Sequence, residues 1–493
     1  MAKNQEAPGV DIAPKDEDLE ILEMRACLEL LGIHRESEGD RYQVLLDPEG
    51  IVLQPQSPAG IKGAEVLYEA LLERLRAYER GNFYVTDLLS GVRYIFALLR
   101  RSGFLSSDPV RVEVLLQNVQ AFAASGGPDR EARQKHASVA LSAAVLLFNA
   151  IGDAPAAPRW NLLRIETLAE ILRCATAADK ADRVIAFMLD HGSDMIERYY
   201  SSRSSEDRAV LENNDAENGI REDGDFATAR CGYYRALFYA LKAAEEHVRF
   251  RTDIIVDTDF ETLLIQTGCR ALEVAETSKL VQDSDREVAV EIVCRALAAP
   301  SFTKFAELLR LETIQADTHM RYACEALTLL DESLYESLLA GHGNESEVTE
   351  AVHKHRQMIE TKLRVLRVSR ACARGEYAAE KPERSSEEPA CDSKSHRGAR
   401  ILPYAALAKH VGMTESDMNL DEEVEKWIIL AIQFGVLRAK IDQAKKMIRI
   451  DYAFDPDSST SRESWQLVAG RLERLRLQIA QIADTTESIL LAP

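Results

Sequence analysis

Long apolar runs are missing from this sequence of 493 residues. A membrane-spanning helix needs roughly 18 or more consecutive apolar residues, and no stretch approaches that length. The first ten residues, MAKNQEAPGV, contain neither an apolar signal region nor a glycine at position 2 for myristoylation. We therefore expect a soluble, cytoplasmic protein that has no membrane partner.

Paired cysteines and nucleotide-binding motifs are also missing. The eight cysteines include no Cys-x-x-Cys pair, and most lie in apolar helical stripes, as Cys294 and Cys324 do. This distribution is typical of reduced, buried thiols. Neither G-x-x-x-x-G-K-[ST] nor a G-x-G-x-x-G after a strand occurs. His353 and His355 would point to different sides of a helix and cannot share a metal ion. We predict a protein that is not an enzyme and has no metal or cofactor.

Positive charge is scarce. The chain has 60 Lys and Arg residues against 81 Asp and Glu residues, which gives a formal net charge of -21. Such a chain repels nucleic acid unless a local basic patch overrides the net charge, because nonspecific affinity comes from neutralised phosphates. The composition therefore argues against direct nucleic-acid binding.

Amphipathic segments of helical length fill most of the chain, with Gly, Pro or Asp at most junctions. A chain of this length is too long for a single core, so we expect several structural units or an array of repeats. No strict residue-level repeat occurs. We predict an irregular α-solenoid of helical repeats over residues 61–373, preceded by an N-terminal helix and an extended segment in residues 1–60.

Two polar segments interrupt this helical pattern. Residues 201–225 and 374–400 are rich in charged residues and contain few apolar ones. Segments of this composition cannot bury enough surface to become ordered on their own. We predict a disordered insert in the solenoid at 201–225 and a disordered linker at 374–400.

The hydrophobic period changes within residues 423–454. The first part has the spacing of a buried helix, and from Val436 the apolar residues alternate as on strands, with Tyr452 and Phe454 on one face with Ile448 and Ile450. Two short helices followed by a hairpin are the element order of a winged-helix domain, which we place at 401–455. The predicted core of this domain comprises Leu407, Val424, Ile428, Leu437, Ile441, Ile448 and Ile450.

A winged helix often binds DNA by placing its second helix in the major groove. Here that helix begins with Asp421, Glu422 and Glu423, which would repel DNA. The cations of the wing could instead contact RNA, but a charge cluster without stacking aromatic residues is a weak signal, and a solvated wing is the simpler interpretation. The candidate RNA-contacting residues are Lys440, Lys445, Lys446 and Arg449.

A long terminal helix is predicted over residues 460–493. Its apolar residues follow the alternating three-four spacing of a coiled-coil seam. The predicted seam comprises Trp465, Val468, Leu472, Leu475, Ile479 and Ile482. We predict that the seam is a partner interface. The alternative is that it folds back on its own solenoid, because periodicity alone does not say which surface a stripe faces.

An irregular helical array closed by a winged helix and a long terminal helix resembles the PCI-domain family, the subunits of the proteasome lid, the signalosome and translation initiation factor three. The resemblance is carried by VEKWIILAIQFGVLRAKIDQAKKMIRI, where AKIDQ is especially typical, and by SWQLVAGRLERLRLQIAQI. Upstream it is carried by REVAVEIVCRALAAPSFTKFAELLRLETIQ and NLLRIETLAEILRCATAADKADRVIAFML. It is greatest to the PCI subunits of initiation factor three and fades at the two polar segments.

The resemblance implies a non-catalytic scaffold protein with an all-α fold and a small β hairpin. Such proteins assemble through their PCI winged helices and their terminal helices. The implied partners are the other subunits of translation initiation factor three, notably an MPN-domain subunit and neighbouring PCI subunits, and through the complex the small ribosomal subunit. The complex recruits mRNA and initiator tRNA. The alternatives are a PCI subunit of the signalosome or proteasome lid and, from another class, a winged-helix nucleic-acid-binding regulator.

Overall fold

The structure is a computed structural model that describes residues 58–77, 85–125, 129–152, 154–155, 157–201, 216–245, 259–340, 346–374, 400–411 and 420–456. The predicted terminal helix lies outside these ranges, as do most of the linker and nearly all of the predicted N-terminal region. The chain divides into two compact units, residues 1–256 and 257–493.

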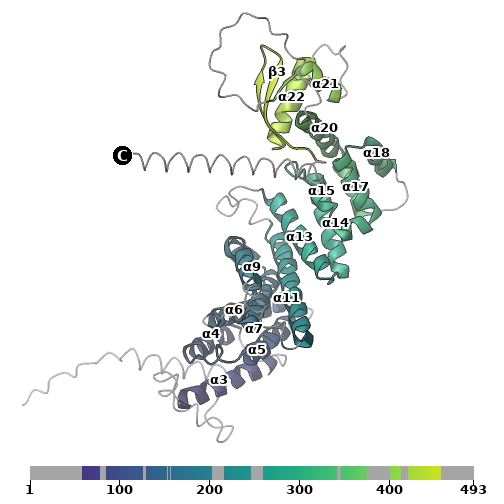
Figure 1. Cartoon of the computed structure of the whole chain (residues 1–493). Coiled ribbons are helices and arrows are strands. Elements are labelled where there is room, and N and C mark those ends of the chain that lie inside the picture. Colours follow the sequence, from purple (N-terminus) through teal and green to yellow (C-terminus); the bar gives the residue numbers. More distant parts are fainter. Residues whose placement is uncertain are drawn as a thin grey trace, which may run out of the picture. The chain divides into compact units, whose positions relative to one another are not determined.

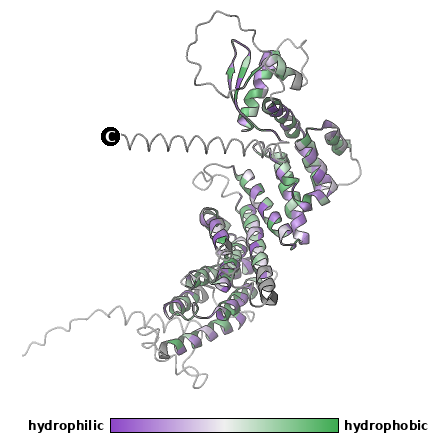
Figure 2. Ribbon diagram, viewed as in Figure 1, coloured by the Kyte–Doolittle hydropathy of each residue, from purple (hydrophilic) through white to green (hydrophobic). Residues whose placement is uncertain are grey.

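The first unit is helical throughout its described residues. Its α-helices are α3 (Pro58–Ala77), α4 (Val85–Arg101), α5 (Pro109–Ala124), α6 (Arg130–Ile151), α7 (Pro158–Ala177), α8 (Ala181–Phe187), α9 (Ser193–Ser201) and α11 (Ala216–Ala243). A π-helical turn, η4 (Met188–Gly192), joins α8 to α9. The helices interleave apolar and polar residues, as expected when one face of each is buried (Figure 2).

Helix α7 lies at the centre of the first unit, in contact with α5, α6, α8, α9 and α11 (Figure 1). It starts with Pro158, whose fixed φ suits the first helical turn. Leu168 and Leu172 are fully buried, and Ala169 and Ala175 nearby leave room for neighbouring helices to approach closely. The pairing of small with large residues in this segment therefore produces a densely packed core.

Helix α11 begins inside the segment 201–225 that the sequence predicted to be disordered. Residues 216–225 are helical, so that prediction is wrong for them. Their sequence, AENGIREDGD, contains two glycines and few apolar residues, which lowers its intrinsic helix propensity. The helix continues into residues from Phe226 onward that are buried against α7. Once this packed part is formed, extending the helix costs little per residue.

The second unit contains more repeat-like helices and a small sheet. Its helices are α13 (Phe260–Thr277), α14 (Asp283–Ala298), α15 (Phe305–Leu308), α16 (Glu312–Ala316), α17 (Thr318–Leu329), α18 (Glu332–Ala340), α19 (Glu347–Lys354), α20 (Arg356–Arg374), α21 (Tyr404–Val411) and α22 (Leu420–Gln433). Its strands are β1 (Arg400–Pro403), β2 (Leu437–Asp442) and β3 (Met447–Ala453). Gly435 ends α22 with a positive φ of 72°, which lets the chain turn into β2.

The strands form one antiparallel sheet in the order β1-β3-β2. Strands β2 and β3 are the predicted hairpin, whereas β1 was not predicted. It pairs with β3 from Arg400 opposite Ile450 to Pro403 opposite Met447. Because the partner of β1 lies far downstream in the chain, no local sequence pattern reveals this strand.

A β-bulge interrupts the hairpin. Ala439 is opposite Ile450, whereas the preceding Arg438 is opposite Tyr452, so Asp451 is an extra residue in β3. Strict alternation had placed Tyr452 on the same face as Ile450, and that expectation is wrong. The extra residue turns Tyr452 to the opposite face of the sheet, where it is 52% exposed.

The division into units differs from the predicted domains. The sequence placed one solenoid at 61–373 and a separate winged helix at 401–455, but the unit boundary falls between 256 and 257, inside the predicted solenoid. The winged helix belongs to the same unit as the preceding helices from α13 onward. Helix α20 causes this grouping because it contacts α14, α17 and α19 as well as α21, α22 and β3.

Candidate partner interface

The winged helix is held to the helical repeats by a buried serine on α20. Ser369 is fully buried, and its Oγ lies 2.9 Å from the carbonyl oxygen of Val436 and 2.5 Å from that of Phe454. The N–H of Phe454 donates to the same Val436 oxygen at 2.8 Å. One hydroxyl therefore satisfies the two backbone ends of the hairpin next to α20.

Arginines on α20 fix the point at which the chain leaves the winged helix. Arg370 and Arg374 lie 3.6 and 3.2 Å from the carboxylate oxygens of Asp455. Arg370 also donates to the carbonyl oxygens of Leu329 and Thr328 at the end of α17. The segment that follows Asp455 therefore starts from a defined position beside the repeats.

The predicted winged-helix core residues lie together between the helices and the sheet. Leu407, Val424, Ile428 and Ile448 are fully buried, and Leu437 and Ile450 are at most 5% exposed. Ile441 is only half-buried because β2 is an edge strand. Trp427, which was not among the predicted core residues, is also buried, and the Arg364 guanidinium of α20 lies 5.3 Å from its ring centroid.

The tip of the hairpin is attached to the start of α22. Lys446 Nζ lies 2.5 Å from Asp421, and the Gln443 amide donates to Glu425 at 2.8 Å. The buried Tyr404 hydroxyl donates to the other oxygen of Glu425 at 2.9 Å. Burial, reinforced by this carboxylate, raises the pKa of Tyr404, so the hydroxyl stays protonated. The acidic start of α22 therefore binds the protein's own hairpin.

The candidate RNA-contacting residues do not act as one group. Lys446 is paired with Asp421, whereas Lys445 and Lys440 are exposed. Lys440 lies directly opposite Arg449 in the sheet. The predicted seam of the terminal helix, from Trp465 to Ile482, falls beyond residue 456, where the described structure ends.

Reactive chemistry finds little support in the described ranges. They contain no cluster of three or more His, Cys, Asp or Glu residues that could hold a metal ion. Burial raises the pKa of Cys269 to about 12 and that of Cys294 to about 11, which disfavours the nucleophilic thiolate. Cys324 is fully buried, and burial raises its pKa further still.

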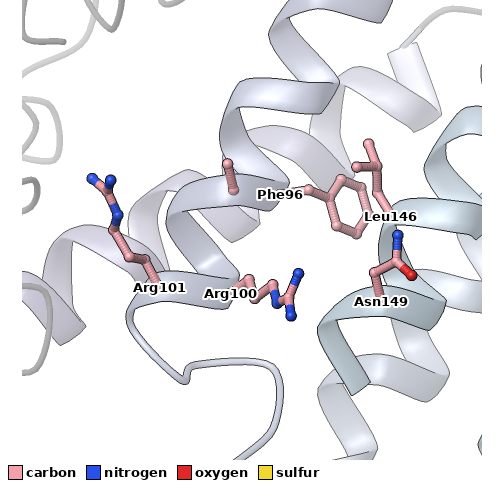
Figure 3. Close-up of a pocket in the computed structure, with 6 residues that line it drawn as sticks. Phe96, Arg100, Arg101, Leu146 and Asn149 are labelled. Atoms are coloured by element: carbon pink, nitrogen blue, oxygen red, sulfur yellow. The ribbon is translucent and has the colours of Figure 1, made fainter. Parts of the chain in front are cut away.

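An open hollow of about 420 Å³ lies between α4 and α6 in the first unit. Figure 3 shows Phe96, Leu146 and Asn149 facing one another across it, with Arg101 pointing away. Its lining contains no carboxylate, histidine or cysteine. This hollow therefore lacks an acid–base pair or a nucleophile, and the winged helix remains the stronger candidate site.

Residues 399–451 match the family model of the PCI domain. The match spans β1, the two helices α21 and α22, β2 and most of β3, and so coincides with the winged helix docked on α20. The second unit of this chain thus carries a PCI domain joined to helical repeats.

The chain is also similar to eukaryotic translation initiation factor 3 subunit M of Emericella nidulans, with 22% identity over 223 residues. The alignment covers 44% of this chain and 43% of the relative, which is less than half the length of either. The two matches confirm the resemblance found in the sequence and the predicted fold class of helical repeats followed by a winged-helix PCI domain. No described helix is both long and apolar enough to cross a membrane.

Proposed function

We propose that this protein is a non-catalytic scaffold within the translation initiation factor three complex. The observation that carries the proposal is the coincidence of the PCI match with a winged helix docked on helical repeats. The similarity to a component of an initiation factor favours this complex over the signalosome and the proteasome lid, which remain the alternatives.

Assembly through the winged helix and the terminal helix is part of this proposal. The terminal seam begins soon after Asp455, whose position is set by two arginines of α20. A helix that starts there can present its apolar seam to helices of neighbouring subunits. The proposed partners are an MPN-domain subunit and neighbouring PCI subunits. Through them the protein would support recruitment of mRNA and initiator tRNA to the small ribosomal subunit in the cytoplasm.

A winged-helix regulator that reads duplex DNA is the alternative of another class. The residue pattern of α22 argues against it, because Asp421 and Glu425 hold the hairpin and Glu422 is exposed where phosphates would approach. A helix with this charge would repel the phosphate backbone rather than enter a groove.

The test is affinity purification of the tagged full-length protein with identification of the co-purifying proteins. We expect initiation factor subunits; signalosome or lid subunits would contradict the proposed complex. Leu472→Asp with Leu475→Asp should abolish co-purification, since burying each leucine contributes about 1.5 to 3 kcal/mol. Gln466→Asp with Gln481→Asp adds the same charge away from the seam and should leave assembly intact. Equal assembly of both double variants would exclude the seam as the interface.

A further inference from the structure

The face of the PCI sheet that points away from the helices carries an unusual set of exposed side chains. Leu402, Ile448 and Ile450 face the helices and are buried. On the opposite face, called here the outer face, Tyr452 is 52%, Ile401 64% and Met447 39% exposed. Monomeric proteins seldom expose large apolar and aromatic side chains side by side on one sheet face.

The strand register places cations directly among these residues. Arg449 in β3 lies between Ile401 of β1 and Lys440 of β2, in one row across the sheet. Tyr452 lies opposite Arg438, which is two residues before Lys440 and therefore shares its face. The β-bulge at Asp451 creates this arrangement, because without it Tyr452 would point into the core.

Two of these cations oppose each other across neighbouring strands. Lys440 and Arg449 are a directly opposed like-charge pair, which destabilises an isolated sheet. The Nε of Arg449 lies 3.9 Å from Oδ1 of Asp451 and has no hydrogen-bond partner among the described residues. An anion bound between the two cations would relieve this repulsion.

Carboxylates near the outer face limit how strongly an anion could bind. Asp442 shares the row of Met447 and accepts a hydrogen bond from the N–H of Lys445 at 3.1 Å. Asp451 lies in the bulge beside Arg449. Arg438, Lys440, Arg449 and the exposed Lys445 still outnumber these two carboxylates, so the face is locally basic in an acidic protein.

We infer that the outer face of the PCI sheet binds single-stranded RNA, with a base stacked on Tyr452 and phosphates held by Arg438, Lys440 and Arg449. A single strand offers an anion and a planar ring within one nucleotide, and sheet surfaces with exposed aromatic side chains are a recurring platform for unstacked bases. Lys446 takes no part because it is paired with Asp421. The set therefore differs from the four wing cations considered from the sequence.

RNA fits this face better than an acidic protein segment does. A carboxylate could bridge Lys440 and Arg449, but it would leave Tyr452 without a partner. The sequence-based objection to RNA was the absence of stacking aromatic residues beside the wing. The bulge removes that objection by bringing Tyr452 next to Arg438.

The test measures binding of a fluorescein-labelled twelve-nucleotide oligouridine to the purified full-length protein by fluorescence anisotropy at 50 mM salt. We expect saturable binding that Tyr452→Ala weakens about tenfold and that Tyr452→Phe leaves within about twofold, because phenylalanine retains the stacking ring. Arg438→Gln with Lys440→Gln should weaken binding and lower the slope of log affinity against log salt by about 1.4, since each phosphate contact on a single strand contributes roughly 0.7.

Lys304→Gln with Lys354→Gln removes the same charge from exposed sites elsewhere in this unit and is the matched control. It should leave the affinity within about twofold. Absence of binding by the wild type, or equal affinities of the wild type and Tyr452→Ala, would overturn the proposal. A twelve-residue polyglutamate peptide that binds as tightly as the RNA would assign the face to an acidic protein segment instead. Because the isolated chain is used, each of these results is independent of the subunits that co-purify with it.

Discussion

The two units of this protein each bury a cation at the end of a neighbouring helix, and they do so in different ways. In the first unit Arg164 donates to the Asn161 side chain at 2.8 Å and to the carbonyl oxygens of Ile151 and Ala154, at the end of α6. In the second unit Lys362, which is fully buried, donates to the carbonyl oxygen of Ala296 in the last turn of α14.

The difference follows from the shapes of the two cations. A guanidinium presents a planar set of donors that satisfies several acceptors at once, whereas an ammonium is a compact charge that is costly to remove from water. The Lys362 Nζ also lies 5.2 Å from the Phe305 ring centroid. Burial nevertheless lowers the pKa of Lys362 to about 7, with only a small opposing effect from Asp259. The second unit should therefore respond to pH in a way that the first does not.

The largest expected effect is on the pH dependence of stability. The pKa of Lys362 is about 7 in the folded protein and 10.5 when unperturbed, so between these values the unfolded chain binds the extra proton. Stability therefore rises with pH across this window, by up to about 1.4 kcal/mol per pH unit. Lys362→Met, measured by urea unfolding between pH 7 and 9.5, should remove this rise.

The control for this experiment is Lys304→Met, which changes an exposed lysine of the same unit. It should keep the wild-type slope. If Lys362→Met also kept that slope, Lys362 would be charged in the folded protein near neutral pH, and the comparison with Arg164 would fail.

A second experiment converts the first unit to the arrangement of the second. Arg164→Lys retains the charge but can satisfy fewer of the three acceptors around it, which leaves at least one buried carbonyl without a donor. We expect a loss of about 2 to 3 kcal/mol in the free energy of unfolding, measured by urea denaturation. Arg159→Lys, at an exposed position of the same helix, should change stability by less than about 0.5 kcal/mol. Equal effects of the two variants would show that the guanidinium geometry is unimportant at position 164.

The smallest expected effect concerns the attachment of the winged helix. Ser369→Ala removes the hydroxyl that serves the carbonyl oxygens of Val436 and Phe454. We expect a loss of about 1 kcal/mol and faster hydrogen exchange at the amide of Phe454 than in the wild type. Ser337→Ala, whose hydroxyl is exposed and donates to the carbonyl of Ser333 within α18, should change neither quantity. Unchanged exchange in Ser369→Ala would mean that apolar packing alone holds the winged helix to α20.

Local patterns in the sequence determined most of the helices and the hairpin. The apolar residues of α7 and α22 recur with the helical period, and those of β2 and β3 alternate, so each element could be recognised from its own residues. The same periodicity identified Leu407, Val424 and Ile428, which lie buried in the winged helix. The polar insert was predicted incorrectly at residues 216–225, because contact of the rest of α11 with α7 outweighs a poor local propensity.

The tertiary structure alone decided the features that depend on residues distant in the chain. Strand β1 exists because β3 offers it an edge, and the face on which Tyr452 lies depends on one extra residue in the register of two strands. A lysine in a sequence is expected at the surface, yet Lys362 is buried, because packing of α20 on α14 encloses its side chain next to an unsatisfied helix end. Periodicity reports which residues share a face of one element; strand register and enclosure depend on what packs against that face, and no local pattern contains this.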